Sequence, residues 1–221
     1  SSFSMIVLEK ELSKPYEMID MVTTPDGSLV AMVHCNNCTS DLNAWVNLFK
    51  EYQELLGIPV DMDELYGKLY NIALTGDTDC GGLLSYNYIS GEPVTGLAEG
   101  RPLFVRSAND KFNLANFMRA HLYASVGVLK IGNDILFNEE KIKVDRITGH
   151  GGLFRTKGVG QRVLAAAINS PISVMETAGE GGAWGIALLG SYLVNNKKGQ
   201  SLADFLDESV FVSDAGVEVS P

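Results

Sequence analysis

The chain has 221 residues, of which 46% are hydrophobic and 20% charged, and its formal net charge is -10. This composition is typical of a globular protein with one substantial core. The negative charge argues against a nucleic-acid partner, which needs clustered lysine and arginine. No apolar run reaches the ~18 residues of a membrane span, and no secretory signal opens the chain. Three cysteines, an odd number, fit a reducing cytoplasm better than a disulfide framework.

The N-terminal third of the chain predicts three strands, at Phe3–Leu8, Glu17–Thr23 and Leu29–Cys35. Thr24-Pro25-Asp26-Gly27-Ser28 separates the last two. Pro-Asp-Gly is a strong turn signal, so these two strands are expected to form a hairpin. Three consecutive antiparallel strands followed by helices and strands are compatible with several α/β and α+β folds.

Three helices are predicted in the middle of the chain. Leu42–Leu56 and Met62–Leu74 carry apolar residues at helical spacing, and Asp61 is a plausible cap of the second. The longest helix runs from Phe112 to about Phe137. Between them, Thr75–Gly100 is rich in glycine and irregular apart from a strand at Leu83–Tyr88. Loops of this length are often functional.

The stretch around which the chain is organised follows Asp145. It predicts a strand at Ile142–Thr148, a glycine turn, a helix that Asn169-Ser170-Pro171 ends, and a second strand at Pro171–Met175. Thr156 can cap the helix, and the helix should bury one face, made of Val159, Val163, Ala166 and Ala167. Gly149, Gly151 and Gly152 lack side chains where the backbone turns, so a ligand can approach the main chain. A glycine turn that leads from a strand into a helix is where α/β folds bind nucleotides.

The sequence predicts fewer elements at the end of the chain. A helix of small residues begins after Glu180, and its face Ala183, Ala187, Gly190, Val194 is expected to pack closely. After Lys197 we expect one short helix near Leu202–Leu206 and no closing element. One domain covering residues 1–221 is the economical interpretation.

Other residues that could bind metal or act in catalysis are better explained by structural roles. Cys35-Asn36-Asn37-Cys38 is a single C-x-x-C without a second ligand pair, so two ordinary thiols are favoured over a zinc or redox site. His121 is expected in the core. His150 lies inside the glycine turn, where it either touches a nucleotide or supports the turn. Glu176 and Glu180 more simply end a strand and open a helix than work as an acid/base pair. No metal-ligand set is predicted.

A family resemblance rests on an ordered set of motifs. Gly-His-Gly-Gly-Leu-Phe-Arg-Thr at 149–156, Asn-Ser-Pro-Ile-Ser-Val at 169–174 and Glu-Gly-Gly-Ala-Trp-Gly-Ile-Ala at 180–187 resemble the adenosine-binding end of the FGGY carbohydrate kinases. Leu83–Glu92 resembles the family's "LPYLSGER", and Phe117–Leu122 its "LxRAxLEG" helix. His150 and Trp184 depart from the pattern, and Pro93 follows "SGE" where xylulokinases have arginine.

The resemblance implies a fold, a site and an activity. The fold would be α/β and ribonuclease-H-like (actin-like ATPase), with one mixed sheet whose N-terminal strands are antiparallel, flanked by helices. The adenine and ribose of ATP would lie against Gly151, Gly152 and Leu153, with a hydroxyl from Thr156. Gly81 and Gly82 would form the other wall of the pocket, and Ser1 and Ser2 would lie at the phosphate loop. Mg²⁺ would accompany ATP.

The resemblance also implies that the chain is the C-terminal part of a longer, cytoplasmic sugar kinase, similar to xylulokinase. The catalytic aspartate and most of the sugar pocket would precede Ser1, so no catalytic residue is assigned in this chain and the fragment alone should be inactive. The sugar remains open among xylulose, ribulose, fuculose and gluconate. Family members are often dimers, which makes a homodimer a further expectation.

Two alternatives stay open. A non-catalytic actin-like binding module would keep the fold without the reaction. In a dinucleotide-binding oxidoreductase, Gly149-x-Gly151-x-x-Phe154 would stand for G-x-G-x-x-G, with Glu176 near the ribose. Phe154 in place of the third glycine weakens the second alternative. The chain has no G-x-x-x-x-G-K-[ST], which excludes a P-loop.

Overall fold

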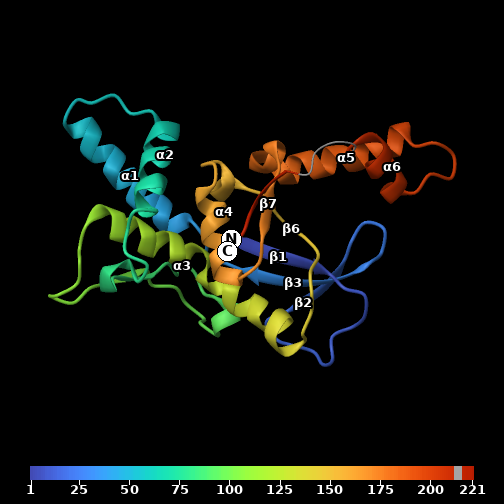
Figure 1. The fold of residues 1–221 in the computed structure, drawn as a ribbon, viewed down its shortest axis with the longest axis horizontal. Helices are drawn as coiled ribbons and strands as arrows, with labels where there is room; N and C mark the ends of the chain where they lie inside the picture. The colour runs from blue at the N-terminus through green and yellow to red at the C-terminus, as the bar shows by residue number, and fades with distance from the viewer. Residues whose placement is uncertain (212–215) are drawn as a thin grey trace. The chain divides into compact units, whose positions relative to one another are not determined.

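The computed structural model describes residues 1–211 and 216–221, except for the side chains of residues 176 and 177. Helices and strands both contribute, so the chain is a mixed α/β protein (Figure 1). Its contacts divide it into two compact units, Ser1–Val144 and Asp145–Pro221, and each is described by itself. That residues 1–221 act as one domain stays a prediction. No helix in the described part of the chain is long and apolar enough to cross a bilayer.

The first unit opens with an antiparallel sheet of three strands in the order β1-β3-β2. The strands are β1 (Ser2–Val7), β2 (Asp20–Thr23) and β3 (Leu29–Cys35). The β2–β3 hairpin is closed by a 2.9 Å bond from the amide of Thr24 to the carbonyl of Ser28, and Gly27 adopts a φ of +92°. A left-handed residue is what a tight hairpin turn needs, so the predicted hairpin is confirmed.

Three helices form most of the remaining core of this unit. They are α1 (Ser40–Leu55), α2 (Met62–Ala73) and α3 (Leu114–Asp134), the last continued by a π-helical turn, η3 (Ile135–Glu139). The α1–α2 hairpin packs on α3, and α3 also contacts β3 (Figure 1). Asp61 accepts a 3.1 Å bond from the amide of Glu64, which confirms it as the cap of α2.

The segment between α2 and α3 contains more structure than its sequence predicts. It holds two short 3₁₀ turns, η1 (Cys80–Gly82) and η2 (Pro93–Thr95), and an antiparallel pair, β4 (Leu84–Tyr86) and β5 (Leu103–Val105). The strand at β5 was not predicted, because a run of three residues carries no visible alternation.

The second unit is a strand–helix–strand unit with a later strand added. Its elements are β6 (Ile147–Gly149), η4 (Gly152–Phe154), α4 (Val159–Ile168), β7 (Ile172–Val174), η5 (Glu176–Glu180), α5 (Gly181–Asn195), α6 (Leu202–Ser209) and β8 (Val217–Val219). β6 is parallel to β7, and β8 is antiparallel to it. Asn169, with a φ of +52°, ends α4 as predicted. The expectation of no closing element is wrong, because Val217–Val219 pairs with the exposed edge of β7.

Four further expectations are corrected. Within the described residues, the strands make three separate hydrogen-bonded sheets instead of one mixed sheet. The strand expected from Ile142 begins at Ile147, since the amide of Ile142 bonds instead to the carbonyl of Leu136 at 3.0 Å. The small face of α5 is exposed throughout, and on α4 Ala166 is exposed.

A buried glutamine on α4 connects the strands of the second unit. Gln161 Nε2 donates to the carbonyls of Ile172 on β7 (2.6 Å) and Val217 on β8 (2.5 Å). A glutamine in an apolar helix face gives no sign in the sequence of the carbonyls it will meet.

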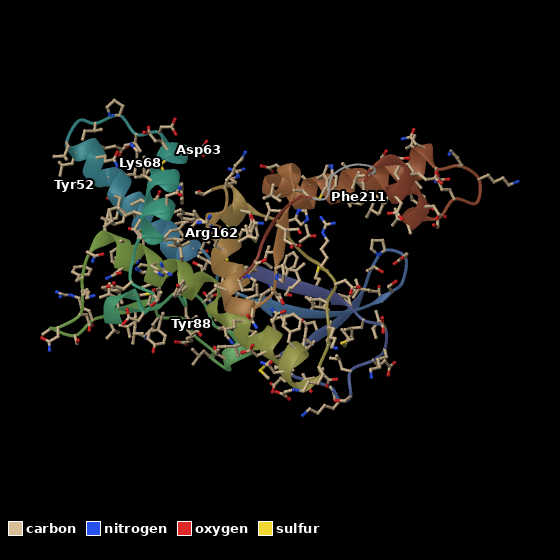
Figure 2. All side chains as sticks on the ribbon, viewed as in Figure 1. Tyr52, Asp63, Lys68, Tyr88, Arg162 and Phe211 are labelled. Carbon is tan, nitrogen blue, oxygen red and sulfur yellow. The ribbon has the colours of Figure 1, made fainter. Side chains whose placement is uncertain are left out.

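Gln161→Leu should destabilise the second unit by about 2 kcal/mol, because it removes the Nε2 donor from the carbonyls of Ile172 and Val217. Arg162→Leu is the matched control, since Arg162 is the exposed neighbour of Gln161 on α4 (Figure 2). Urea unfolding, with amide exchange read at β7 and β8, measures the difference. Equal losses in the two variants would contradict the bridging role of Gln161.

Candidate nucleotide-binding site

The glycine turn after β6 is built from one left-handed residue and one short 3₁₀ turn. Gly151 has a φ of +110°, which side chains rarely tolerate. Its amide donates to the carbonyl of Ala178 at 2.7 Å, and its carbonyl accepts from the amide of Phe154 at 3.0 Å. The turn is thereby held to the segment that follows β7.

Two side chains of the turn, Phe154 and His150, pack against glycines. The ring of Phe154 lies over Gly149, where an added Cβ would come within 2.6 Å of it. His150 packs on Gly181 at the start of α5, where an added Cβ would meet the His150 Cβ at 2.7 Å. Burial lowers the pKa of His150. Arg155 pairs with Glu180 at 2.7 Å. His150 therefore packs against the start of α5, which favours a supporting role, and its contact with a nucleotide stays a prediction.

The space next to Gly151 and Gly152 is open. A Cβ built on Gly151 or Gly152 would meet nothing within 4 Å. Among the described residues, the amides of Gly152 and Leu153 have no acceptor. Two free amides beside a glycine surface are the donors that a helix or turn N-terminus offers to a nucleotide.

Thr156 does not cap α4, which corrects that expectation. The N-cap position is Gly158, in the left-handed region at φ +77°, and no side chain caps the helix. The 3₁₀ turn at Gly152–Phe154 takes up residues before α4 begins, so Thr156 lies too far from the first free amides of the helix. Its carbonyl instead accepts from the amide of Val159 at 3.3 Å.

Gly81 and Gly82 lie in the first unit, in η1, at φ +62° and +88°. An added Cβ would approach Asn116 Nδ2 to 2.3 Å at Gly81 and Asp110 Oδ1 to 2.5 Å at Gly82. Both glycines are therefore required by backbone conformation and close packing. Asn116 and Asp110 were missed from the sequence, because they lie beyond the loop that they contact.

Ser2 is the first residue of β1, and Ser1 precedes it. Ser2 is the pairing partner of Cys35 on β3, and its buried Oγ has no hydrogen-bond partner among the described residues. The structure thus brings Gly151, Gly152 and Leu153 into one turn with Thr156 just beyond it. Gly81, Gly82, Ser1 and Ser2 belong to the other unit.

The thiols and acidic groups that the structure describes are not grouped as metal ligands. Cys35, Cys38 and Cys80 are free thiols, and burial raises the pKa of Cys35 to about 12. Within residues 1–211 and 216–221, no three His, Cys, Asp or Glu side chains are grouped to hold a metal ion. Mg²⁺ commonly keeps several waters and binds through substrate phosphates with one or two carboxylates. Glu176, proposed beside a ribose in the dinucleotide alternative, has its side chain outside the described part of the chain.

Similar structures come from sugar and polyol kinases. Gluconate kinase from Lactobacillus acidophilus superposes with a TM-score of 0.70 at 18% identity, covering 99% of this chain and 41% of that one. Xylulose kinase from Rhodospirillum rubrum gives 0.68 at 17% identity, covering 99% and 40%. Plasmodium falciparum glycerol kinase with ADP gives 0.63 at 16%, covering 92% and 38%. The chain spans about two fifths of the length of these proteins. At these identities the likeness shows the fold alone.

A family model decides the assignment. A search among curated proteins found no match. The model of the FGGY family of carbohydrate kinases, C-terminal domain, matches residues 1–194, which is most of the chain. The chain therefore belongs to the FGGY family of carbohydrate kinases and carries its C-terminal domain.

Proposed function

We propose that the chain is the ATP-binding part of a cytoplasmic sugar kinase that phosphorylates a ketopentose or a related sugar such as xylulose. The observation that carries the proposal is the turn at Gly151–Leu153, with its open glycine face and two free amides. Family membership supplies the reaction class.

In the proposed site, each residue has one role in binding the nucleotide. Gly151, Gly152 and Leu153 border the adenine and ribose, because a side chain at either glycine would occupy that space. The Thr156 hydroxyl is available to the ribose. Gly81 and Gly82 belong to the adenosine-binding residues, and Ser1 and Ser2 contact the phosphates. ATP, with Mg²⁺ on its phosphates, supplies the phosphoryl group.

The sugar hydroxyl and its aspartate base belong to the part of the kinase before Ser1, so this chain alone should bind nucleotide without transferring phosphate. The proposed ribonuclease-H-like fold is supported by the three antiparallel strands followed by helices and a parallel strand pair. The sugar partner through the N-terminal half, and a homodimer, belong to the same proposal.

Calorimetric titration of the chain with ATP, ADP and NAD⁺ in the presence of Mg²⁺ tests the site. Gly152→Trp should weaken ATP binding at least about 100-fold, or about 2.7 kcal/mol, because the indole would fill the open face of the turn. Gly190→Trp is the control, since Gly190 lies on the exposed face of α5 with nothing within 4 Å of its Cβ position.

The outcomes separate the alternatives. Binding of adenine nucleotides that is lost in Gly152→Trp and kept in Gly190→Trp supports the kinase. Selective binding of NAD⁺ would overturn it in favour of the oxidoreductase. Absence of binding in the wild-type chain would favour a module without nucleotide function.

A further inference from the structure

The connection between β3 and α1 is tied to a distant loop. We name residues Asn36–Thr39 the 36–39 corner and residues Asn87–Glu92 the 87–92 loop; Tyr88, labelled in Figure 2, belongs to this loop. Asn36 donates to the carbonyl of Gly91 at 2.8 Å, and Asn87 donates to the carbonyl of Cys38 at 2.7 Å. The corner is therefore fixed from both of its ends.

Asn37 is the centre of this connection. It is buried, and its side-chain oxygen accepts from the amides of Ile89 (2.9 Å) and Ser90 (3.1 Å), while Nδ2 donates to the carbonyl of Ser90 at 3.1 Å. The two asparagines inside the C-x-x-C therefore explain this motif better than its thiols do.

Glu92 holds Asn37 from the end of the loop. Its Oε2 accepts from the backbone amide of Asn37 at 3.1 Å and from Asn37 Nδ2 at 3.0 Å. The Glu92 side chain is 0% exposed, and its Oε1 has no partner among the described residues. Burying a carboxylate with one oxygen unpaired is costly, so a loop that needed only packing would be better served by an apolar residue.

The corner follows the end of β3 that pairs with the start of β1. Cys35, the residue before the corner, pairs with Ser2 in the antiparallel register. The buried hydroxyl of Ser2 is unpartnered. Any shift of the corner therefore shifts the strand end beside which Ser1 and Ser2 lie.

We propose that Glu92 is a positioning residue: through Asn37 it fixes the 36–39 corner, and thereby aligns Ser1 and Ser2 with the phosphates of the nucleotide. This inference rests on the proposed nucleotide-binding function. Glu92 touches neither nucleotide nor sugar, because it is fully buried.

The role of Glu92 is tested by two substitutions, one of which keeps a hydrogen-bond acceptor while the other removes it. Glu92→Met keeps the length and removes the acceptor, whereas Glu92→Gln keeps one oxygen for both Asn37 donors. Glu99→Met is the matched control, because Glu99 is exposed on the following loop. Amide exchange at residues 2–4 reports the hold on β1, and calorimetry compares Mg²⁺-ATP with adenosine.

In Glu92→Met, we expect exchange at residues 2–4 to rise about tenfold and the Kd for ATP to rise about tenfold. The Kd for adenosine should stay within twofold, because adenosine has no phosphates to misalign. Glu92→Gln and Glu99→Met should both match the wild type. Should Glu92→Met fail to fold, Asn36→Ala removes one exposed bond and should give smaller shifts in the same direction.

Three results would overturn the role of Glu92. They are unchanged exchange at residues 2–4, equal losses for ATP and adenosine, and a Glu92→Gln variant as impaired as Glu92→Met. A wild-type chain that binds neither ATP nor adenosine would instead refute the proposed function and with it the phosphate role. In that case the exchange data would still show whether Glu92 holds β1.

Discussion

Gly132→Ala should destabilise the first unit by about 1–3 kcal/mol, because α3 crosses β3 at this residue without room for a methyl group. A Cβ built on Gly132 would lie 2.2 Å from Val33 Cγ1 and 3.1 Å from Cγ2. Val33 is fully buried in the middle of β3, and its branched side chain has little rotamer freedom. The helix or the strand must therefore move.

The same substitution five residues earlier provides a control of opposite sign. Gly127 lies on the same helix, and nothing comes within 4 Å of its Cβ position. Gly127→Ala should therefore stabilise α3 by about 0.5–1 kcal/mol, through the backbone entropy that glycine loses on folding.

Urea unfolding of the two variants measures the difference. Combining Gly132→Ala with Val33→Ala removes the clashing methyl groups, so the double variant should lose less than the sum of the single losses. Strictly additive losses, or a stabilising Gly132→Ala, would show that α3 does not approach β3 in this way.

Stability should fall as pH drops from about 6.5 to about 4, and His121 is the residue responsible. Its ring is 1% exposed and packs between Phe117, Phe104 and Trp45, with centroids 4.4, 5.7 and 5.5 Å away. Burial lowers the pKa of His121 to about 4.

The groups that face His121 do not favour its charged form. Nδ1 lies 2.9 Å from Ser85 Oγ and 3.5 Å from Asp41 Oδ2, and Nε2 is buried without a partner among the described residues. Burial raises the pKa of Asp41. Protonation of Asp41 would therefore weaken its attraction for a charged His121 at low pH.

The direction of the pH effect follows from where the proton binds. The unfolded chain takes up a proton on His121 near pH 6.5, whereas the folded chain does so only near pH 4. The unfolded state therefore binds more protons than the folded state in this pH window. The contribution of neutral His121 to folding stability is fully present above the window and is lost as pH falls through it. The difference amounts to about 3 kcal/mol at the acid end.

Unfolding free energies measured between pH 7 and pH 4 test this expectation. His121→Gln should remove most of the slope, whatever it costs at pH 7. His34→Gln should keep the slope, because the His34 side chain is exposed on β3. A slope that survives in His121→Gln would assign the effect to other groups.

Local chemistry was sufficient to predict three features of the fold. The Pro-Asp-Gly turn, the Asp61 cap and the end of α4 at Asn169 were predicted correctly, because each depends on the backbone preferences of a few adjacent residues. The position of the glycine turn after β6 was predicted for the same reason. Its contact with a nucleotide stays a prediction.

Errors arose where a residue's partner lies far along the chain. The pairing of β8 with β7, the two carbonyls bridged by Gln161 and the exposed face of α5 depend on contacts that no local pattern encodes. The Thr156 cap failed because a 3₁₀ turn, which has no strong sequence signal, takes up residues before the helix.

By itself, the sequence determined the order of the α-helices and of the strands other than β5 and β8, the Pro-Asp-Gly and glycine turns, and the family, since hydrophobic period, turn residues and spaced motifs are local properties. Only the tertiary structure decided that Glu92 is buried against Asn37, that His121 lies among aromatic rings and that Gly132 has no room for a methyl group. Burial, close packing and the cost of an unpaired polar atom are properties of a position in three dimensions, so they appear only when residues distant in the chain meet.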